Sequence, residues 1–145
     1  MSEKLTQVRP RSDFAAFEAV DTRWEDNDAY GHVNNVVYYS FFDTAINRYL
    51  IEHGGLNVLD SPEIGLVVET HCHYFSSIAF PATVEVGLKV VHIGRSSVKY
   101  ELGIFKGDQD LCSAWGHFVH VYVNRLTQKT VNIPNKVREI LQKLV

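Results

Sequence analysis

The chain has 145 residues, of which 46% are hydrophobic and 21% charged, and its formal net charge is −3. This size and composition are typical of one globular domain, so we expect a single domain over residues 1–145 with a poorly ordered polar start over residues 1–12. The net negative charge argues against binding to nucleic acid, and the longest apolar run is too short to cross a membrane. The start lacks the apolar run of a secretory signal, so we expect a cytoplasmic protein in which Cys72 and Cys112 are free, buried thiols.

The pattern along the chain predicts one strand, one helix and then four long strands. A strand candidate over Phe14–Trp24 ends in a polar stretch, and a helical pattern runs from about Asn35 to His53, where Gly54 and Gly55 supply a left-handed stop. Alternating apolar residues and tight turns then predict four antiparallel strands and a closing helix. These elements are Ile64–Phe75, Pro81–His92, Val98–Ile104, Leu111–Val123 and the helix Pro134–Leu144.

The predicted helix over Asn35–His53 is unusual because large apolar side chains surround most of it. Its polar residues form one narrow stripe, made of Ser40, Asp43, Thr44, Asn47 and Arg48. A helix that is apolar nearly all round must be enclosed. We therefore expect a long curved antiparallel sheet wrapped around one buried helix, with free sheet edges covered by pairing in a homodimer or homotetramer.

The densest polar segment, residues 26–35, lies just ahead of this helix. A helix N-terminus offers unpaired N–H groups and a partial positive charge, which can hold an anion or polarise a carbonyl. A carboxylate just before it can act as a general base or as a nucleophile, and Gly31 lets the backbone approach a ligand closely. The same residue types occur in ordinary loops and N-caps, so composition alone leaves a structural role open.

The string Asp28-Ala29-Tyr30-Gly31-His32-Val33-Asn34-Asn35, followed by Tyr38, Tyr39, Phe42 and Ala45, resembles the signature of the 4-hydroxybenzoyl-CoA thioesterase-like hotdog family. The resemblance extends to the order of elements along nearly the whole chain. It implies an α+β hotdog fold and an acyl-CoA thioesterase that converts a CoA thioester into free acid and CoA. It also implies that Asp28 is the catalytic aspartate and that the backbone N–H of Asn35 polarises the thioester carbonyl.

A third residue of the motif, His32, resembles the histidine of plant acyl-carrier-protein thioesterases, which carry a similar H-V-N-N run. Those enzymes have an asparagine two residues earlier, where this chain has Tyr30. That departure favours the aspartate-centred mechanism, in which we expect Tyr30 and Gly31 to contact the substrate. A carrier-protein thioester as substrate and a non-catalytic acyl-binding role stay open as alternatives.

A second candidate site is the turn that begins at Gly94. Arg95, Ser96 and Ser97 place a cation, hydroxyls and backbone N–H groups together, which suits a CoA phosphate, although a solvated hairpin end has the same composition. The histidines at positions 71, 73, 117 and 120 show no spacing that is diagnostic of a metal site. Thioester hydrolysis needs an oriented base and an oxyanion donor, so we expect no metal and no cofactor other than the CoA of the substrate.

Overall fold

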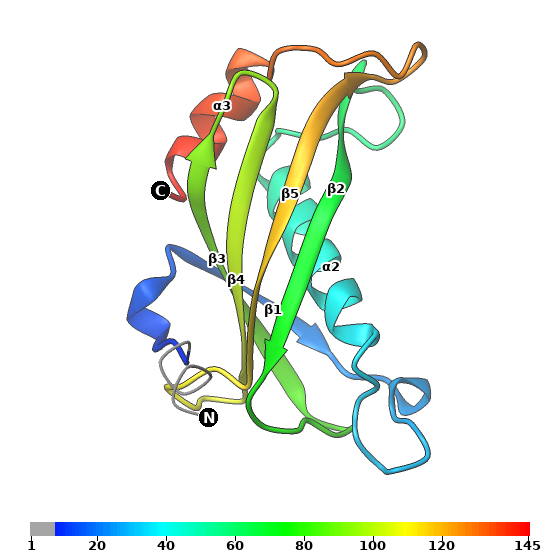
Figure 1. Cartoon of the computed structure of the whole chain (residues 1–145), viewed down its shortest axis with the longest axis vertical. Helices are drawn as coiled ribbons and strands as arrows, with labels where there is room; N and C mark the ends of the chain where they lie inside the picture. Colours follow the sequence, from blue (N-terminus) through cyan, green and yellow to red (C-terminus); the bar gives the residue numbers. More distant parts are fainter. Residues whose placement is uncertain (1–7) are drawn as a thin grey trace.

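A computed structural model describes residues 8–145, which form a five-stranded antiparallel sheet with a long helix against one face (Figure 1). The long helix α2 spans Val37–Glu52, and the short helix α3, Asn135–Gln142, packs against β3. Two short 3-10 helices flank β1, namely η1 (Arg11–Asp13) and η2 (Trp24–Asp26). The strands are β1 (Ala16–Asp21), β2 (Glu63–Tyr74), β3 (Thr83–Ile93), β4 (Ser97–Lys106) and β5 (Ala114–Asn124), in the sheet order β1-β3-β4-β5-β2.

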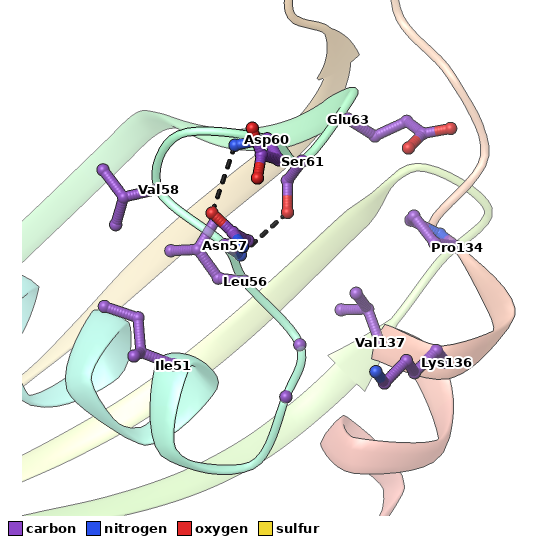
Figure 2. A pocket seen from close by; sticks show the side chains of 12 residues that line it. Ile51, Leu56, Asn57, Val58, Asp60, Ser61, Glu63, Pro134, Lys136 and Val137 are labelled. Atoms are coloured by element: carbon purple, nitrogen blue, oxygen red, sulfur yellow. Dashed lines mark hydrogen bonds between the residues drawn. The ribbon is translucent and has the colours of Figure 1, made fainter.

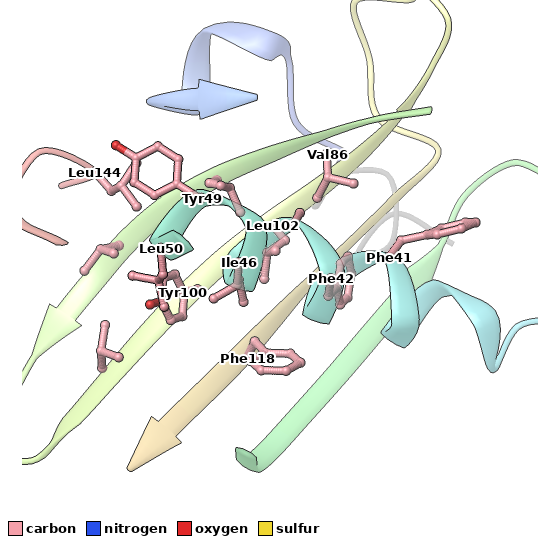
Figure 3. Packing of buried hydrophobic residues seen from close by; sticks show 14 of the residues in the cluster. Phe41, Phe42, Ile46, Tyr49, Leu50, Val86, Tyr100, Leu102, Phe118 and Leu144 are labelled. Carbon is pink, nitrogen blue, oxygen red and sulfur yellow. The ribbon is translucent and has the colours of Figure 1, made fainter. Parts of the chain in front are cut away.

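The core lies between α2 and the concave face of the sheet. Alternate residues of the central strands are buried there, as the sequence pattern predicts. In Figure 3, Phe42 and Ile46 of α2 pack over Val86, Leu102 and Phe118 of three neighbouring strands. The predicted curved sheet around one helix is confirmed.

The helix starts and stops through local hydrogen bonds. The Asn34 side chain accepts the Val36 N–H at 3.1 Å, and the Asn34 carbonyl accepts the Val37 N–H at 2.9 Å, so the regular helix begins two residues after the predicted Asn35. At the other end Gly54 has φ 79°, a conformation that glycine adopts at low cost, which confirms the predicted stop.

One chain encloses only part of α2. The sheet covers one side, whereas Ile51 is 47% exposed and Val36, just before the helix, is 65% exposed. Strand β2 pairs only with β5, so its other edge is free within the described chain, and Leu66, Val67 and Val68 on that strand are exposed. The all-round enclosure that the sequence predicts for the helix is therefore incomplete in a single chain.

The first described residues are held in place. Pro10 bridges to Leu111, and Arg11 donates hydrogen bonds to Glu85 and to the carbonyl of Gly107. Of the predicted poorly ordered start, Pro10 and Arg11 thus contact the sheet and its turns, while residues 1–7 lie outside the described part of the chain. Cys72 and Cys112 are free thiols, as expected, but only Cys112 is buried, whereas Cys72 is half-buried. Among the described residues, no helix has the length and hydrophobicity needed to span a membrane.

Candidate functional site

The loop between η2 and α2 holds Asp28 in a tight turn. The Asp28 N–H donates to the His32 carbonyl at 2.8 Å, and the Gly31 N–H donates to the Asp28 carbonyl at 3.1 Å. Gly31 has φ 84°, which residues with a Cβ rarely adopt. The Asp28 Oδ1 accepts the Tyr30 N–H at 2.8 Å, so the carboxylate itself is oriented by the turn.

Further hydrogen bonds attach this loop to its surroundings. The Asn34 N–H donates to the Asp26 carbonyl at 2.8 Å, and the Val33 N–H donates to the Ile78 carbonyl at 2.7 Å. The Asn27 side chain accepts the Phe80 N–H at 3.1 Å. The backbone that carries the motif is therefore fixed against the segment between β2 and β3.

The two carboxylates of the loop have different environments. Asp26 is buried and accepts hydrogen bonds from the backbone N–H and the guanidinium of Arg23, at 2.7–3.1 Å. Asp28 is half-buried, and no cation forms an ion pair with it among residues 8–145. Because the Asp26 carboxylate is buried and paired with Arg23, Asp28 is the better candidate of the two for chemistry.

The backbone N–H of Asn35 points away from the helix. A trans peptide unit holds its C=O and N–H in opposite directions, and the Asn34 carbonyl of this unit is directed at the Val37 N–H. Within the described residues, no acceptor bonds the Asn35 N–H. Tyr74, at the end of β2, fixes the next peptide unit by donating its hydroxyl to the Asn35 carbonyl at 2.8 Å. A free, oriented donor therefore lies ahead of α2.

Asp28 and Asn35 line the same open cleft, which has a volume of about 370 Å³. Its other lining residues are Val33, Tyr38, Tyr74, Phe75, Ser76 and Ser77. The rings of Tyr38 and Tyr74 pack edge to face, with centroids 4.9 Å apart. Burial raises the pKa of Tyr38 to about 12 and that of the nearby Cys72 thiol to about 12, so both groups stay protonated at neutral pH. A carboxylate and a backbone donor thus face one cleft that has no competing thiolate.

Other predicted site residues lie outside this cleft in the single chain. His32 is exposed, with its backbone carbonyl engaged by Asp28, and Tyr30 is 87% exposed. Gly31 shapes the turn and does not line the cleft. Sequence reasoning did not find Tyr74, Ser76 or Ser77, because only the folded sheet brings the end of β2 to the start of α2.

The turn with Arg95, Ser96 and Ser97 lies at the opposite end of the sheet from the Asp28 loop (Figure 1). Its backbone carbonyls are engaged: Arg138 of α3 donates to the carbonyls of Gly94 and Arg95, at 2.9 and 3.3 Å. Arg95 and Arg138 therefore form a small basic group that the sequence alone did not reveal. Within one chain, this group is far from Asp28.

Three histidines lie on the outer face of the sheet. His117 Nε2 lies 3.2 Å from His71 Nδ1 and 2.6 Å from a carboxylate oxygen of Glu69. Burial, followed by the neighbouring His117 and His73, lowers the pKa of His71 to about 4. Within residues 8–145, no group of three or more histidine, cysteine or acidic side chains has the arrangement of a metal site. His120 faces the other side of the sheet, toward α2.

Another cavity, of about 750 Å³, lies at the far end of α2, between the loop over residues 54–62 and α3 (Figure 2). The loop is internally bonded: the Asn57 side chain accepts the Asp60 N–H at 3.2 Å, and Ser61 Oγ accepts the Asn57 N–H at 2.9 Å. The cavity is lined by Asp60, Glu63 and Lys136, and it contains none of the residues of the Asp28 motif. The Asp28 cleft is therefore the better candidate for chemistry.

A curved antiparallel sheet around one helix is the architecture of a hotdog protein. The family model of the thioesterase superfamily matches residues 30–113, which is more than half of the chain. The chain belongs to the thioesterase superfamily, and it is a thioester hydrolase. The matched region begins two residues after Asp28. No curated protein matches the chain.

Solved structures agree with this family. The PA5185 protein from Pseudomonas aeruginosa strain PAO1 is 50% identical with a TM-score of 0.93, and the match covers 94% of this chain and 96% of that one. The PA2801 protein of Pseudomonas aeruginosa, described as a putative thioesterase, is 26% identical with a TM-score of 0.79, covering 87% and 97%. A 1,4-dihydroxy-2-naphthoyl-CoA thioesterase from Synechocystis shares the fold at 13% identity, with a TM-score of 0.78 and coverage of 87% and 94%.

Proposed function

We propose that this protein hydrolyses an acyl-CoA thioester to the free acid and CoA through an aspartate-centred mechanism. The observation that carries the proposal is the pair formed by Asp28 and the unbonded Asn35 N–H, which line one cleft. A fixed backbone donor at a helix start can stabilise the oxyanion that forms when a thioester carbonyl is attacked. The named activity of the Synechocystis neighbour, a CoA thioesterase, agrees with this reaction.

The steps follow from these two groups. Asp28 takes a proton from a water molecule, whose oxygen adds to the carbonyl carbon, and the negative charge moves to the carbonyl oxygen beside the Asn35 N–H. The carbon–sulfur bond then breaks, and CoA leaves as a thiolate that gains a proton. In the alternative route the Asp28 carboxylate itself adds to the carbonyl carbon, the carbon–sulfur bond breaks and the CoA thiolate leaves, and water then hydrolyses the resulting anhydride to the free acid and the Asp28 carboxylate. Neither route requires a metal or a cofactor beyond the CoA of the substrate.

The proposed working form is a homodimer that pairs the free edges of β2. Exposed Leu66, Val67 and Val68 lie on that strand, and exposed Ile51 and Val58 lie at the far end of α2 and in the loop after it. Because antiparallel pairing about a two-fold axis reverses the second strand, the Tyr74 end of one β2 meets the Glu63 end of the other. The partner would then cover the apolar groups that one chain leaves open.

The same pairing brings the basic turn of the partner to the end of the sheet that carries the Asp28 cleft. Arg95 with Ser96 and Ser97, joined by Arg138, would then supply a cationic contact for a phosphate of CoA. His32 and Tyr30 are exposed on the same loop as Asp28, where a bound substrate or a partner chain can reach them. His32 would then help to hold the thioester, with Asp28 as the central group.

The proposal is tested by thiol release from a panel of acyl-CoA esters that includes aliphatic chains and one aryl ester. The same acyl groups on carrier protein are measured in parallel. We expect higher kcat/KM for the CoA esters, because the proposed contacts of the basic turn would engage the additional phosphates that CoA carries and the phosphopantetheine of a carrier protein lacks. Faster hydrolysis on carrier protein would favour the alternative substrate, and no thiol release from either series would leave only the acyl-binding alternative.

A further inference from the structure

Two serine hydroxyls line the Asp28 cleft. Ser76 and Ser77 belong to the segment between β2 and β3, and both residues are exposed. Val33 and Tyr38, which line the same cleft, are buried. The cleft therefore has an apolar part that is shielded from solvent and a polar part that is open to it.

The backbone that carries the two hydroxyls is held in place. The Ser76 N–H donates to the Ser113 carbonyl at 3.2 Å, and the Lys106 ammonium donates to the Ser77 carbonyl at 3.2 Å. Neither hydroxyl has a hydrogen-bond partner among residues 8–145. Because a hydroxyl can both donate and accept, this fixed pair is ready to hold a polar group of a ligand with little ordering cost.

A CoA thioester carries such a polar group close to its reacting carbonyl. The thioester sulfur is followed by two methylene groups and then by an amide, the first of the pantetheine arm. Since the charged nucleotide of CoA stays in water, the arm must leave the cleft through its exposed part, where Asn35, Ser76 and Ser77 lie. An amide N–H that loses water on entering the cleft needs a new acceptor, and the serine hydroxyls are acceptors at this place.

We propose that the hydroxyls of Ser76 and Ser77 bind the first amide of the pantetheine arm, with a hydroxyl oxygen accepting the amide N–H. The inference rests on the proposed function, because Asp28 and the Asn35 N–H define where the thioester lies. The substrate class is then an acyl thioester of pantetheine, whether on CoA or on a carrier protein, and a simple alkyl thioester lacks the contact. Ser76 and Ser77 are specificity residues for the thiol side of the substrate.

Two small thioesters that differ in one group test the inference. The octanoyl thioester of N-acetylcysteamine keeps the amide, whereas that of 2-mercaptoethyl acetate has an ester oxygen in place of the N–H. With each kcat/KM divided by the rate constant for hydroxide hydrolysis, we expect the wild type to prefer the amide by about three- to tenfold, the effect of one hydrogen bond. The double variant Ser76→Ala/Ser77→Ala should bring this ratio to about one, and Ser12→Ala, on the exposed η1, should keep the wild-type ratio. Equal values in the wild type, or a preference that survives in the double variant, overturn the inference.

A binding experiment separates this inference from the proposed function. The probe is CoA itself, titrated calorimetrically into the wild type, the double variant and Ser12→Ala. We expect the Kd for CoA to rise by about three- to tenfold in the double variant and to stay unchanged in Ser12→Ala. An equal Kd in the wild type and the double variant, or no binding of CoA to the wild type, rejects the contact. A weaker Kd in the double variant of a protein that hydrolyses no thioester would instead reject the proposed hydrolysis and leave the pantetheine contact standing.

Discussion

The hydrogen bond from Tyr74 to the Asn35 carbonyl gives a quantitative test of the cleft. Tyr74→Phe removes one hydroxyl and leaves the ring that packs on Tyr38. If the bond positions the Asn35 N–H for the oxyanion, its loss removes about 0.5–1.5 kcal/mol of transition-state stabilisation, which corresponds to a fall in kcat of about 2- to 13-fold. KM should change by less than about twofold, because the bond acts on the donor and not on the remote part of the substrate.

The assay is steady-state thiol release from an acyl-CoA ester, with thermal unfolding measured in parallel. Tyr100→Phe is the matched control, because the Tyr100 hydroxyl is buried without a partner among residues 8–145. Its loss should leave kcat unchanged and should not lower stability. A Tyr74→Phe enzyme with wild-type kcat, or one whose loss appears only in KM, would refute the positioning role.

Three further changes test other parts of the structure. Arg95→Glu should raise KM for CoA esters more than it lowers kcat, and an unchanged KM would remove Arg95 from the phosphate site. Val67→Lys on the free β2 edge should shift the oligomer toward monomer in light scattering and lower activity in proportion, whereas full activity in a monomer would contradict the composite site. Burial lowers the pKa of the His120 ring from 6.5 to about 4, so between these pH values the unfolded chain binds more protons than the folded chain. The contribution of His120 to the free energy of unfolding should therefore be full above pH 6.5 and should fall by about 3 kcal/mol toward pH 4. In urea titrations, His120→Asn should lose less stability than the wild type over that pH range, and an equal loss would contradict the assignment of this pH dependence to His120.

Much of the fold follows from local patterns in the sequence. Alternation along Val84–Val90 and Val98–Ile104 shows which side chains enter the core, and Gly54 marks the end of the helix. These signals are local, because backbone geometry fixes the period of each element. The turn at Asp28 is also local, because hydrogen bonds between near neighbours such as His32 form it, whereas bonds to Ile78 and Phe80 hold the loop against the rest of the fold.

Contacts between distant segments could not be predicted in the same way. The hydrogen bond between Tyr74 and Asn35 forms because the Tyr74 end of β2 lies beside the start of α2. The alternation of apolar and polar residues predicts which face of a strand is buried, but it does not predict which other element lies beside each end of the strand. For the same reason the sequence did not predict that the Arg95 turn lies at the opposite end of the sheet from Asp28 within one chain. Alternation alone also did not show that His120 Nδ1 lacks a hydrogen-bond partner among residues 8–145, because such partners can come from several elements.

In the proposed mechanism, Asp28 activates the attack on the thioester. The most direct measurement is kcat of Asp28→Asn, which keeps the shape of the side chain and removes its basicity, with Asp108→Asn on an exposed turn as the control. The account predicts a loss of about 10²- to 10⁴-fold in kcat with unfolding little changed, and wild-type activity for the control. A correctly folded Asp28→Asn enzyme within about threefold of wild type would contradict the mechanism.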